Sequence, residues 1–387
     1  MPWETTAASQ AETLTTVRGG APGVQVAVYP LPDYQGRPWS QWGQGVVLPD
    51  GRFLSAVGDH IGQDGNSYFF EYNPETESLS RVADVLALVP HQRGAWGYGK
   101  VHAQMLPGPC GGVWVTTYWG TRRDITYGDG YEGDIFIEID PAARTIGSRG
   151  LVLERHGVPS LAGGGDTALM YGEAVDPYDD SGVFVVYDPI AAEVVWSHSD
   201  DRHIGFRSIA VDDLGRAYYS LGEGRLARYD PAENERSVLE DTIPGDFLRA
   251  ATAPDDAGII YGVTRSPARF FALDPDGGIR DLGPALSYTT SLALTADQEA
   301  FLSVPAAHGK AWTFGAPLVA VDTDDGDQEI LVELAPLVED ALGLRLGGTY
   351  SIAADPARNR VFIGMNASAG SDDSGFGHVV LVIVTLP

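Results

Sequence analysis

A short signature, an apolar residue followed by Asp or Asn and then usually by Pro, recurs along this chain of 387 residues. Each copy ends a short alternating apolar stretch and precedes a second β-rich stretch, which is typical of a strand, a tight turn and another strand. Successive copies lie 67, 48, 42, 44 and 48 residues apart. The copies are Tyr72-Asn73-Pro74, Ile139-Asp140-Pro141, Tyr187-Asp188-Pro189, Tyr229-Asp230-Pro231, Leu273-Asp274-Pro275 and the weaker Val321-Asp322-Thr323.

A second template opens most repeats: small apolar residues, an Asp-centred turn and another strand, as in 207–219 and 351–363. A supersecondary unit repeated every ~40–50 residues indicates radial repetition of four-stranded sheets. Together the two templates predict an all-β fold, a seven-bladed β-propeller with four-stranded antiparallel blades. The predicted blades are 46–83, 100–155, 158–196, 204–243, 248–286, 288–339 and 347–385.

The segment 24–29 precedes the first blade and has no partner of its own. We expect this N-terminal strand to pair with the last blade and close the ring, because closure removes the exposed sheet edges. Residues 23–387 would then form a single propeller domain, preceded by a polar, poorly ordered lead over 1–22. A short helix is expected near 334–342.

The composition agrees with one large all-β domain. Hydrophobic residues make up 44% of the chain, and 48 glycines with 25 prolines suit many turns. No window has the length and apolarity of a membrane span. The single cysteine, Cys110, excludes an internal disulfide and a cysteine-based metal cluster. We expect a monomer.

The N-terminus shows no charged-then-apolar signal region after Met1. Taken at face value, the sequence predicts a cytoplasmic protein. A precursor that had been trimmed after export would leave the same sequence, so the localisation stays open.

The formal net charge is −28, and the 25 basic residues include only two lysines, Lys100 and Lys310. The acidic residues are spread through the turns and form no long run. This charge argues against nucleic acid as a ligand, since phosphate binding needs a basic surface. We give it no role beyond solubility.

Polar and aromatic groups stand at the start of most blades, where a plain scaffold needs only small residues. Strand starts lie around one mouth of the central channel, so we expect these groups to converge there. Arg offers a planar fork for carboxylate, and Tyr and Trp offer stacking faces for sugar rings. The candidate substrate-binding residues are Lys100, Trp119, Arg249, Tyr261, His308, Lys310 and Tyr350.

Lys100 and His102 stand two residues apart and are therefore expected on one face of a strand. Neighbouring positive charges repel and burial opposes both of them, so such a pair is costly without a function. This makes His102 a candidate catalytic residue. For His60, lining the channel and capping a turn are equally good interpretations.

Three short motifs carry a resemblance to a known family: Gly99-Lys100-Val101-His102, Thr117-Tyr118-Trp119 and Phe206-Arg207. With the seven blades, they resemble the seven-bladed propeller polysaccharide lyases, namely the ulvan lyases and the related oligogalacturonate lyases. Ulvan-lyase-like members use a His, a Tyr and an Arg in the central site, often with a second His about one strand after the first.

The resemblance implies that His102 is the first His, Arg207 the Arg, and Tyr171 or Tyr187 the Tyr. The second His has no match, because the following strand offers Tyr118 and Trp119 instead.

The activity implied by the resemblance is β-elimination on an acidic glycan, a polysaccharide that contains uronic acid. Arg207, helped by Arg249, would neutralise the uronate carboxylate and acidify the adjacent proton. His102 or Tyr118 would remove that proton as general base, and Tyr171 would donate a proton to the departing oxygen.

The sequence predicts no cofactor, and a structural metal ion is left as an alternative. A zinc ion would need His102 together with a distant ligand such as His60 or His308. The acidic stretch 124–134 has oxygen donors for calcium but lacks the order of an EF-hand loop.

Two other classes of function stay open. A non-catalytic propeller that binds a sugar or a protein is favoured by the missing second His. A metal-dependent lactonase or hydrolase would need carboxylates and amides deep in the channel, for which Glu173, Asn366 and Asp59 are the candidates.

Overall fold

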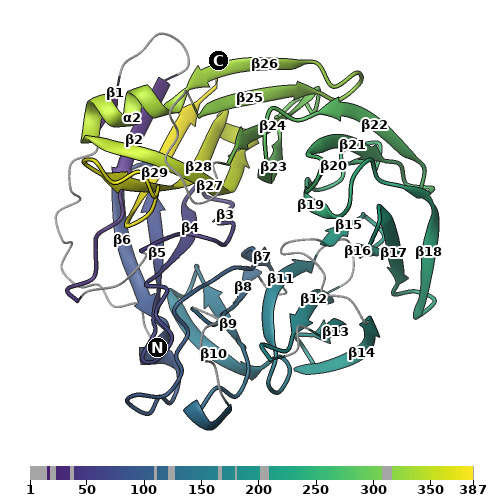
Figure 1. Ribbon diagram of the computed structural model, residues 1–387, viewed down its shortest axis with the longest axis horizontal. Coiled ribbons are helices and arrows are strands. Elements are labelled where there is room, and N and C mark those ends of the chain that lie inside the picture. The colour runs from purple at the N-terminus through teal and green to yellow at the C-terminus, as the bar shows by residue number, and fades with distance from the viewer. Residues whose placement is uncertain are drawn as a thin grey trace.

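Seven sheets stand as blades around a central axis in the computed structural model (Figure 1), which describes residues 15–17, 23–34, 39–108, 111–120, 127–163, 168–178, 181–200, 209–306 and 316–386. Six of the sheets have four antiparallel strands and one has five. The predicted seven-bladed all-β propeller is confirmed, and each predicted blade coincides with one sheet.

The first four blades follow the chain in order. Blade 1 contains β3 (Val46–Val47), β4 (Phe53–Gly58), β5 (Ser67–Asn73) and β6 (Ser78–Asp84). Blade 2 contains β7 (Leu106–Pro107), β8 (Val113–Thr116), β9 (Ile135–Asp140) and β10 (Thr145–Leu151). Blade 3 contains β11 (Gly157–Gly163), β12 (Met170–Val175), β13 (Gly182–Asp188) and β14 (Glu193–Asp200). Blade 4 contains β15 (Ile209–Val211), β16 (Ala217–Gly222), β17 (Arg225–Asp230) and β18 (Glu235–Thr242).

The last three blades continue this order. Blade 5 contains β19 (Leu248–Ala251), β20 (Ile260–Thr264), β21 (Arg269–Leu273) and β22 (Ile279–Pro284). Blade 6 contains β23 (Thr289–Leu294), β24 (Ala300–Pro305), β25 (Pro317–Asp322) and β26 (Gln328–Glu333). Blade 7 contains β27 (Leu344–Asp355), β28 (Arg360–Ala369) and β29 (His378–Thr385), completed by β2 (Gly23–Val28) and β1 (Thr15–Val17).

Helices are short in the described ranges. The α-helices are α1 (Val85–Leu88) and α2 (Leu334–Leu342), and the latter is the helix expected near 334–342. Single 3-10 turns cover Tyr127–Asp129 and Pro356–Arg358. None of the described helices has the length and apolarity needed to cross a membrane.

The N-terminal strand closes the ring, as predicted. β2 runs antiparallel to β29, with Gly23 opposite Thr385 and Val28 opposite Val380. Residues 15–17 of the expected disordered lead form β1, which pairs with β2. The other residues of that lead, 1–14 and 18–22, lie outside the described residues.

The hydrophobic core lies between adjacent blades rather than at one centre. Phe53 of blade 1 stacks on Phe362 of blade 7 with ring centres 4.9 Å apart. Phe184 of blade 3 stacks on Tyr219 of blade 4 at 4.0 Å. Such ring pairs add about 0.5–1.5 kcal/mol each beyond the area they bury, so every blade is held by its two neighbours.

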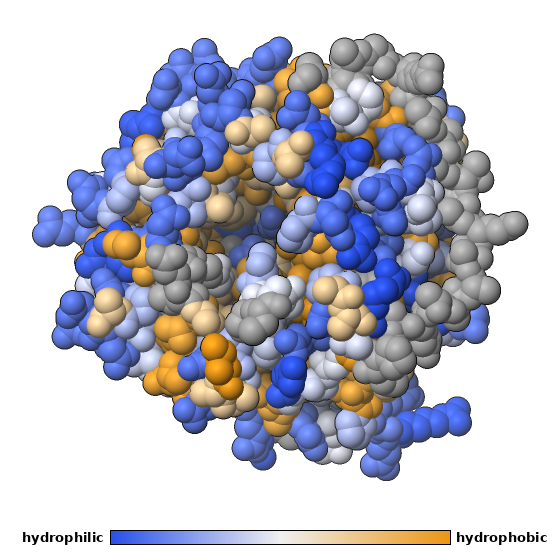
Figure 2. Space-filling model, turned by 180° about the vertical axis from the view of Figure 1, so that it is seen from behind, coloured by the Kyte–Doolittle hydropathy of each residue, from blue (hydrophilic) through white to orange (hydrophobic). Residues whose placement is uncertain are grey.

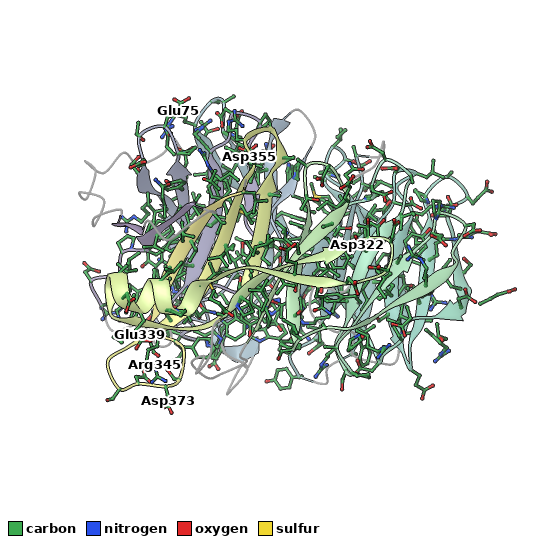
Figure 3. The ribbon with its side chains drawn as sticks, turned by 90° about the horizontal axis from the view of Figure 1, so that it is seen from above. Glu75, Asp322, Glu339, Arg345, Asp355 and Asp373 are labelled. Atoms are coloured by element: carbon green, nitrogen blue, oxygen red, sulfur yellow. The ribbon has the colours of Figure 1, made fainter. Side chains whose placement is uncertain are left out.

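The two faces of the ring carry different connections, because the strands of each blade alternate in direction. The turns from first to second strand and from third to fourth strand lie on one face, here called the turn face. The remaining connections lie on the opposite face, the loop face. Figure 3 shows this separation: Glu75 and Asp355 mark the turn face, whereas Arg345 and Asp373 mark the loop face.

The recurring signature forms the turn between the third and fourth strands. In blade 2, Asp140 Oδ1 accepts hydrogen bonds from the backbone N–H groups of Ala142 at 3.0 Å and Ala143 at 2.8 Å. Because this pattern recurs, a side chain that caps its own turn explains the signature. The same two-bond turn forms at Asn73, Asp188, Asp230 and Asp322.

The turn at Asp274 is the exception among the described copies. Its backbone N–H donates to Gly278 O at 2.9 Å, and Gly277 N–H donates to Asp274 O at 2.9 Å. This turn is therefore closed by the main chain.

Figure 2 shows the molecule from behind Figure 1, where hydrophilic residues are spread over the turn face.

A buried carboxylate, Asp59, holds the loop between β4 and β5. Its oxygens accept the backbone N–H groups of Ile61 and Asn66, each at 2.9 Å, and the hydroxyl of Tyr34 at 2.7 Å. Burial raises the pKa of Asp59 from 3.8 to about 6. The carboxylate thereby fixes the loop that carries His60.

Replacing Asp230 with Ala is expected to lower the free energy of unfolding by about 1 kcal/mol, because two backbone N–H groups lose their acceptor. Asp274→Ala is the matched control, since its turn is closed by main-chain bonds. Scanning calorimetry of both variants tests this. Equal losses in the two variants would contradict the role given to the side-chain cap.

Replacing Asp59 with Asn is expected to change how stability depends on pH. Because folding raises the pKa of Asp59, protonation of this carboxyl stabilises the folded state. The stabilisation is complete below about pH 4 and is lost as the pH rises through about 6. Wild type should therefore lose stability relative to Asp59→Asn as the pH rises through this interval, measured by thermal unfolding. A pH-independent difference between the two proteins would refute the raised pKa.

Candidate functional site

Cationic and aromatic side chains meet on the loop face around Trp42. The Lys100 ammonium nitrogen lies 3.9 Å from the centre of the Trp42 ring and 5.5 Å from that of Tyr118. The His102 ring lies 6.2 Å from Trp42 and 5.7 Å from Tyr118. Three of the predicted site residues therefore share one location, and Trp42, which the sequence analysis did not single out, lies among them.

Three further rings surround Trp42. The ring centres of His60, Tyr350 and Phe376 lie 5.7, 4.7 and 5.6 Å from it. Tyr350 was predicted from the sequence, His60 had two equally good interpretations, and no sequence signal marks Phe376. The resulting loop-face cluster comprises Trp42, His60, Lys100, His102, Tyr118, Tyr350 and Phe376, contributed by blades 1, 2 and 7 and by the chain that enters blade 1.

Glycines allow the loop of blade 1 to pack directly on the start of blade 2. A Cβ on Gly58 would lie 2.2 Å from the carbonyl oxygen of Gly99, and one on Gly120 would lie 2.1 Å from that of Ile61. Backbone this close tolerates no side chain. At this close contact the backbone N–H of His60 donates to Gly99 O at 2.8 Å. The φ angle of His60 is 56°.

Strand alternation orients the two candidate residues of blade 2. Lys100 pairs with Tyr118 in an antiparallel bridge, and Tyr118 N–H donates to Lys100 O at 2.7 Å. Val101 joins the hydrophobic core of blades 1 and 2. Lys100 and His102 both contact the rings of Trp42 and Tyr118, so they lie on the opposite side of the strand from Val101.

Lys100 and His102 are both buried. Lys100 is 9% exposed and His102 is 2% exposed, whereas Trp42 is half-buried. Desolvation opposes a buried ammonium, and the face of an indole offsets part of that cost, by about 0.5–2 kcal/mol. The aromatic rings thus make a charged lysine tolerable at this position.

One hydrogen bond fixes the tautomer of His102. Its Nδ1 lies 3.0 Å from the carbonyl oxygen of Pro159, and a carbonyl can only accept. Nδ1 therefore carries the proton, and in the neutral ring Nε2 carries the lone pair. This is the arrangement that a general base requires.

The second histidine of the cluster, His60, has a lowered pKa. Burial and, secondly, the charge of Lys100 lower the pKa of His60 from 6.5 to about 3. His60 is therefore neutral throughout the neutral pH range and adds no positive charge beside Lys100.

Arg249 lies elsewhere on the ring, in β19 of blade 5. Its Nε donates to the hydroxyl of Tyr288 at 2.6 Å, and its guanidinium carbon lies 5.4 Å from the centre of that ring. Arg249 is buried, and blades 3 and 4 stand between its blade and blade 2, which carries Lys100.

Tyr171 and Tyr261 lie at the turn face rather than in the cluster. The hydroxyl of Tyr171 donates to Gly215 O at 2.5 Å, and that of Tyr261 donates to Asp255 Oδ2 at 2.9 Å. Each is the second residue of the second strand of its blade, so the rest of the strand, about 10–13 Å, separates it from the loop face. All strand starts were expected around one mouth of the channel, whereas the first and second strands of a blade start at opposite faces.

Tyr187 and Trp119 serve packing. Tyr187, the alternative to Tyr171, lies near the turn-face end of β13 with its ring 4.4 Å from Phe136. Trp119 stacks on Tyr118 at 4.1 Å, and a Cβ on Gly157 would lie 2.0 Å from its ring. The Trp119 ring therefore packs against both Tyr118 and Gly157.

Three predicted site residues, Arg207, His308 and Lys310, lie outside the described residues, as does part of the acidic stretch 124–134. Within the described ranges, no group of three or more His, Cys, Asp or Glu side chains is placed to hold a metal ion.

The lactonase candidates have different surroundings. Asn366 exchanges two hydrogen bonds with the backbone of Gln41, at 2.7 and 2.9 Å. Asp59 accepts the bonds that order its loop, and Glu173 is buried in β12. Asn366 and Asp59 therefore have structural roles.

No family model and no curated protein matches this sequence. Solved structures match in fold. A virginiamycin B lyase from Staphylococcus aureus superposes with a TM-score of 0.55 at 10% identity, over 94% of this chain and 100% of that chain. A streptogramin B lyase gives 0.57 at 9% identity, over 93% and 97%. A chain of a mitotic checkpoint complex gives 0.57 at 10% identity, over 91% and 90%.

Identities this low are evidence for the fold alone. These neighbours support the seven-bladed propeller, and they do not support a link to the ulvan or oligogalacturonate lyases in particular. The chain is therefore similar in fold to propellers that include two proteins named lyases and one chain of a larger complex.

Proposed function

We propose that the protein is a lyase-like enzyme that acts by β-elimination on glycans containing uronic acid, at the loop face. The observation that carries the proposal is the placement of the Lys100 ammonium and the tautomer-fixed His102 beside the same two rings, Trp42 and Tyr118. This places a cation and a base together in a largely buried, aromatic site.

β-Elimination makes three demands on such a site. A cation must neutralise the uronate carboxylate, so that negative charge can develop on it as the C5 proton leaves. A base must take that proton, and the electron pair of the C5–H bond then forms the C4–C5 double bond. The C4–O bond breaks at the same time, and an acid protonates the departing oxygen.

The described residues supply a candidate for each role. Lys100 would bind the carboxylate, and its effect is large where water is excluded. His102 would take the proton at Nε2, since Pro159 O binds Nδ1. Tyr118, with its ring 5.7 Å from that of His102, would protonate the leaving oxygen, in place of Tyr171 on the turn face.

The sugar ring itself needs an apolar platform. Trp42, Tyr350 and Phe376 present rings next to Lys100 and His102, and aromatic faces suit the C–H face of a pyranose. The added roles of Arg207 and Arg249 in neutralising the carboxylate remain predictions, since Arg207 lies outside the described residues and Arg249 lies on blade 5.

A non-catalytic glycan-binding propeller is the second candidate. It is favoured by burial: Lys100 and His102 are 9% and 2% exposed, so a substrate reaches them only after neighbouring side chains have moved. A protein that binds acidic glycans through the rim of the cluster alone would need no such movement.

The decisive assay follows the ultraviolet absorbance of the unsaturated uronate product across a panel of uronic-acid polysaccharides. We expect His102→Ala and Lys100→Met each to lower kcat by about 100-fold or more, since a base and a charge stabiliser contribute at least that much. Tyr118→Phe should also lose activity. Tyr171→Phe is the matched control and should keep it, because that hydroxyl bonds to Gly215 on the turn face.

Two outcomes of this assay would refute elimination. One is retained turnover in His102→Ala and Lys100→Met. The other is the absence of product from every substrate while calorimetric titration still records binding, which would favour the glycan-binding propeller.

The pH profile separates the two histidines. Because the pKa of His60 is lowered to about 3, its protonation does not contribute to the profile near neutral pH. We expect the acid limb of kcat/KM to report His102, so His60→Gln should leave the midpoint of that limb unchanged while His102→Gln removes the limb. A shift in the midpoint of the acid limb in His60→Gln would contradict the assignment of this limb to His102.

A further inference from the structure

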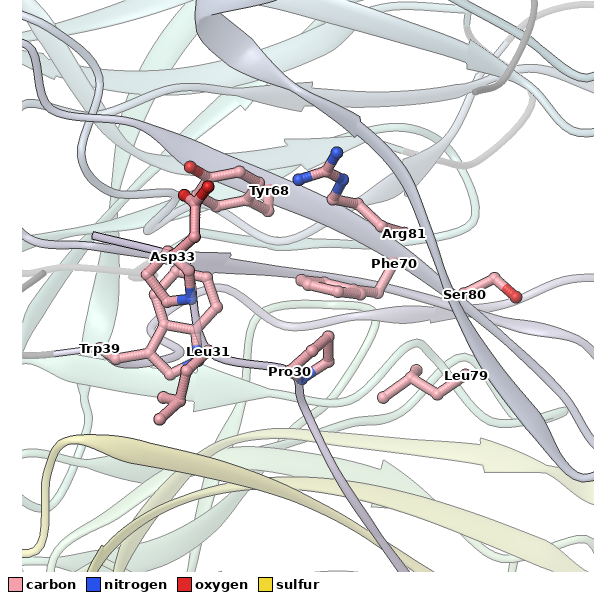
Figure 4. Close-up of a pocket in the computed structure, with 10 residues that line it drawn as sticks. Pro30, Leu31, Asp33, Trp39, Tyr68, Phe70, Leu79, Ser80 and Arg81 are labelled. Atoms are coloured by element: carbon pink, nitrogen blue, oxygen red, sulfur yellow. The ribbon is translucent and has the colours of Figure 1, made fainter. Parts of the chain in front are cut away.

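A cavity of about 330 Å³ lies on the outer side of blade 1, at the seam where the chain leaves β2 (Figure 4). Its walls come from the segment after β2 and from the two outer strands of blade 1, β5 and β6. This seam pocket is separate from the loop-face cluster, with which it shares no residue. It is lined by Pro30, Leu31, Pro32, Asp33, Trp39, Tyr68, Phe70, Leu79, Ser80 and Arg81.

Most of the pocket wall is apolar. Trp39, Tyr68 and Phe70 are buried, and the rings of Trp39 and Tyr68 lie 5.5 Å apart. Leu31 lines the same cavity and is 53% exposed, so this part of the wall is open to solvent. The volume falls at the lower end of the range for small-molecule sites, about 300–1,000 Å³.

One edge of the pocket is polar. Figure 4 shows Asp33 and Arg81 at the same edge as Tyr68, with Leu31, Pro30 and Leu79 along the opposite edge. The Arg81 guanidinium lies over the Tyr68 ring, 5.7 Å from its centre. Arg81 can only donate hydrogen bonds and the Asp33 carboxylate can only accept them, whereas the Ser80 hydroxyl does both.

This combination selects among ligand classes. Because Asp33 and Arg81 carry opposite charges, the edge has no net charge and favours neither an anionic nor a cationic ligand. A neutral ligand with several hydroxyl groups can donate to Asp33 and accept from Arg81 at once. A pyranose has those hydroxyls around its edge and an apolar C–H face for the aromatic floor.

We propose that the seam pocket is a binding site for a neutral pyranose unit. The inference does not depend on the elimination proposed for the loop-face cluster, because a neutral sugar has no carboxylate to activate. In a glycan substrate, such a site would hold an uncharged residue away from the point of cleavage.

The test uses saturation-transfer NMR of the full chain with glucose, galactose, mannose, xylose and rhamnose as separate probes. We expect transfer to the ring protons of at least one sugar. Ser80→Trp should abolish it, because the indole fills the cavity from an exposed position of β6. Ser237→Trp is the matched control, since Ser237 is exposed at the corresponding position of the outer strand of blade 4.

A second variant tests the proposal even if Ser80→Trp does not fold. Arg81→Gln keeps the shape of the pocket edge but loses a charged donor, and should weaken binding of the same sugar by about tenfold. Both variants should retain any elimination activity of wild type. The proposal is overturned if no sugar of the panel shows transfer, or if transfer is the same in wild type, Ser80→Trp and Arg81→Gln.

Discussion

The pairing of β2 with β29 is the constraint on which the rest of the molecule depends. It joins strands from the two ends of the chain, and so sets blade 7 beside blade 1. Through this closure Tyr350 and Phe376 of blade 7 reach Trp42, and the chain that leaves β2 turns at Pro30 into the wall of the seam pocket. Both the loop-face cluster and the pocket are therefore products of ring closure, and neither could form on an isolated blade.

Several of the acidic residues behind the net charge of −28 have a structural use and lie far from the loop-face cluster. At Asp140, Asp188, Asp230 and Asp322 they cap the turns between the third and fourth strands, all on the turn face. The loop face lies about 20 Å away along a six-residue strand. Since the Debye length is about 8–10 Å at physiological ionic strength, these charges are largely screened at Lys100.

The sequence predicted the fold because the capped turn is a local interaction that leaves a mark at each repeat. The Lys100–His102 pair was also predictable, because strand alternation is local. Trp42 and His60 were not: Trp42 reaches the cluster through ring closure, and His60 through the glycine contacts between blades 1 and 2. The placement of Tyr171 and Tyr261 was predicted wrongly, because strand direction alternates within a blade and their strands begin at the turn face.

The contact between Lys100 and Trp42 determines how an acidic glycan would enter the loop-face cluster. At rest the ammonium lies on the indole face, a contact of about 0.5–2 kcal/mol. A uronate carboxylate offers charge-assisted hydrogen bonds of about 1.5–3 kcal/mol each, enough to draw the ammonium off the ring. Trp42, half-buried and released from the cation, would then be available to stack on the sugar. In this view the same charge that binds the substrate opens the site to it, so burial of Lys100 and His102 is compatible with catalysis.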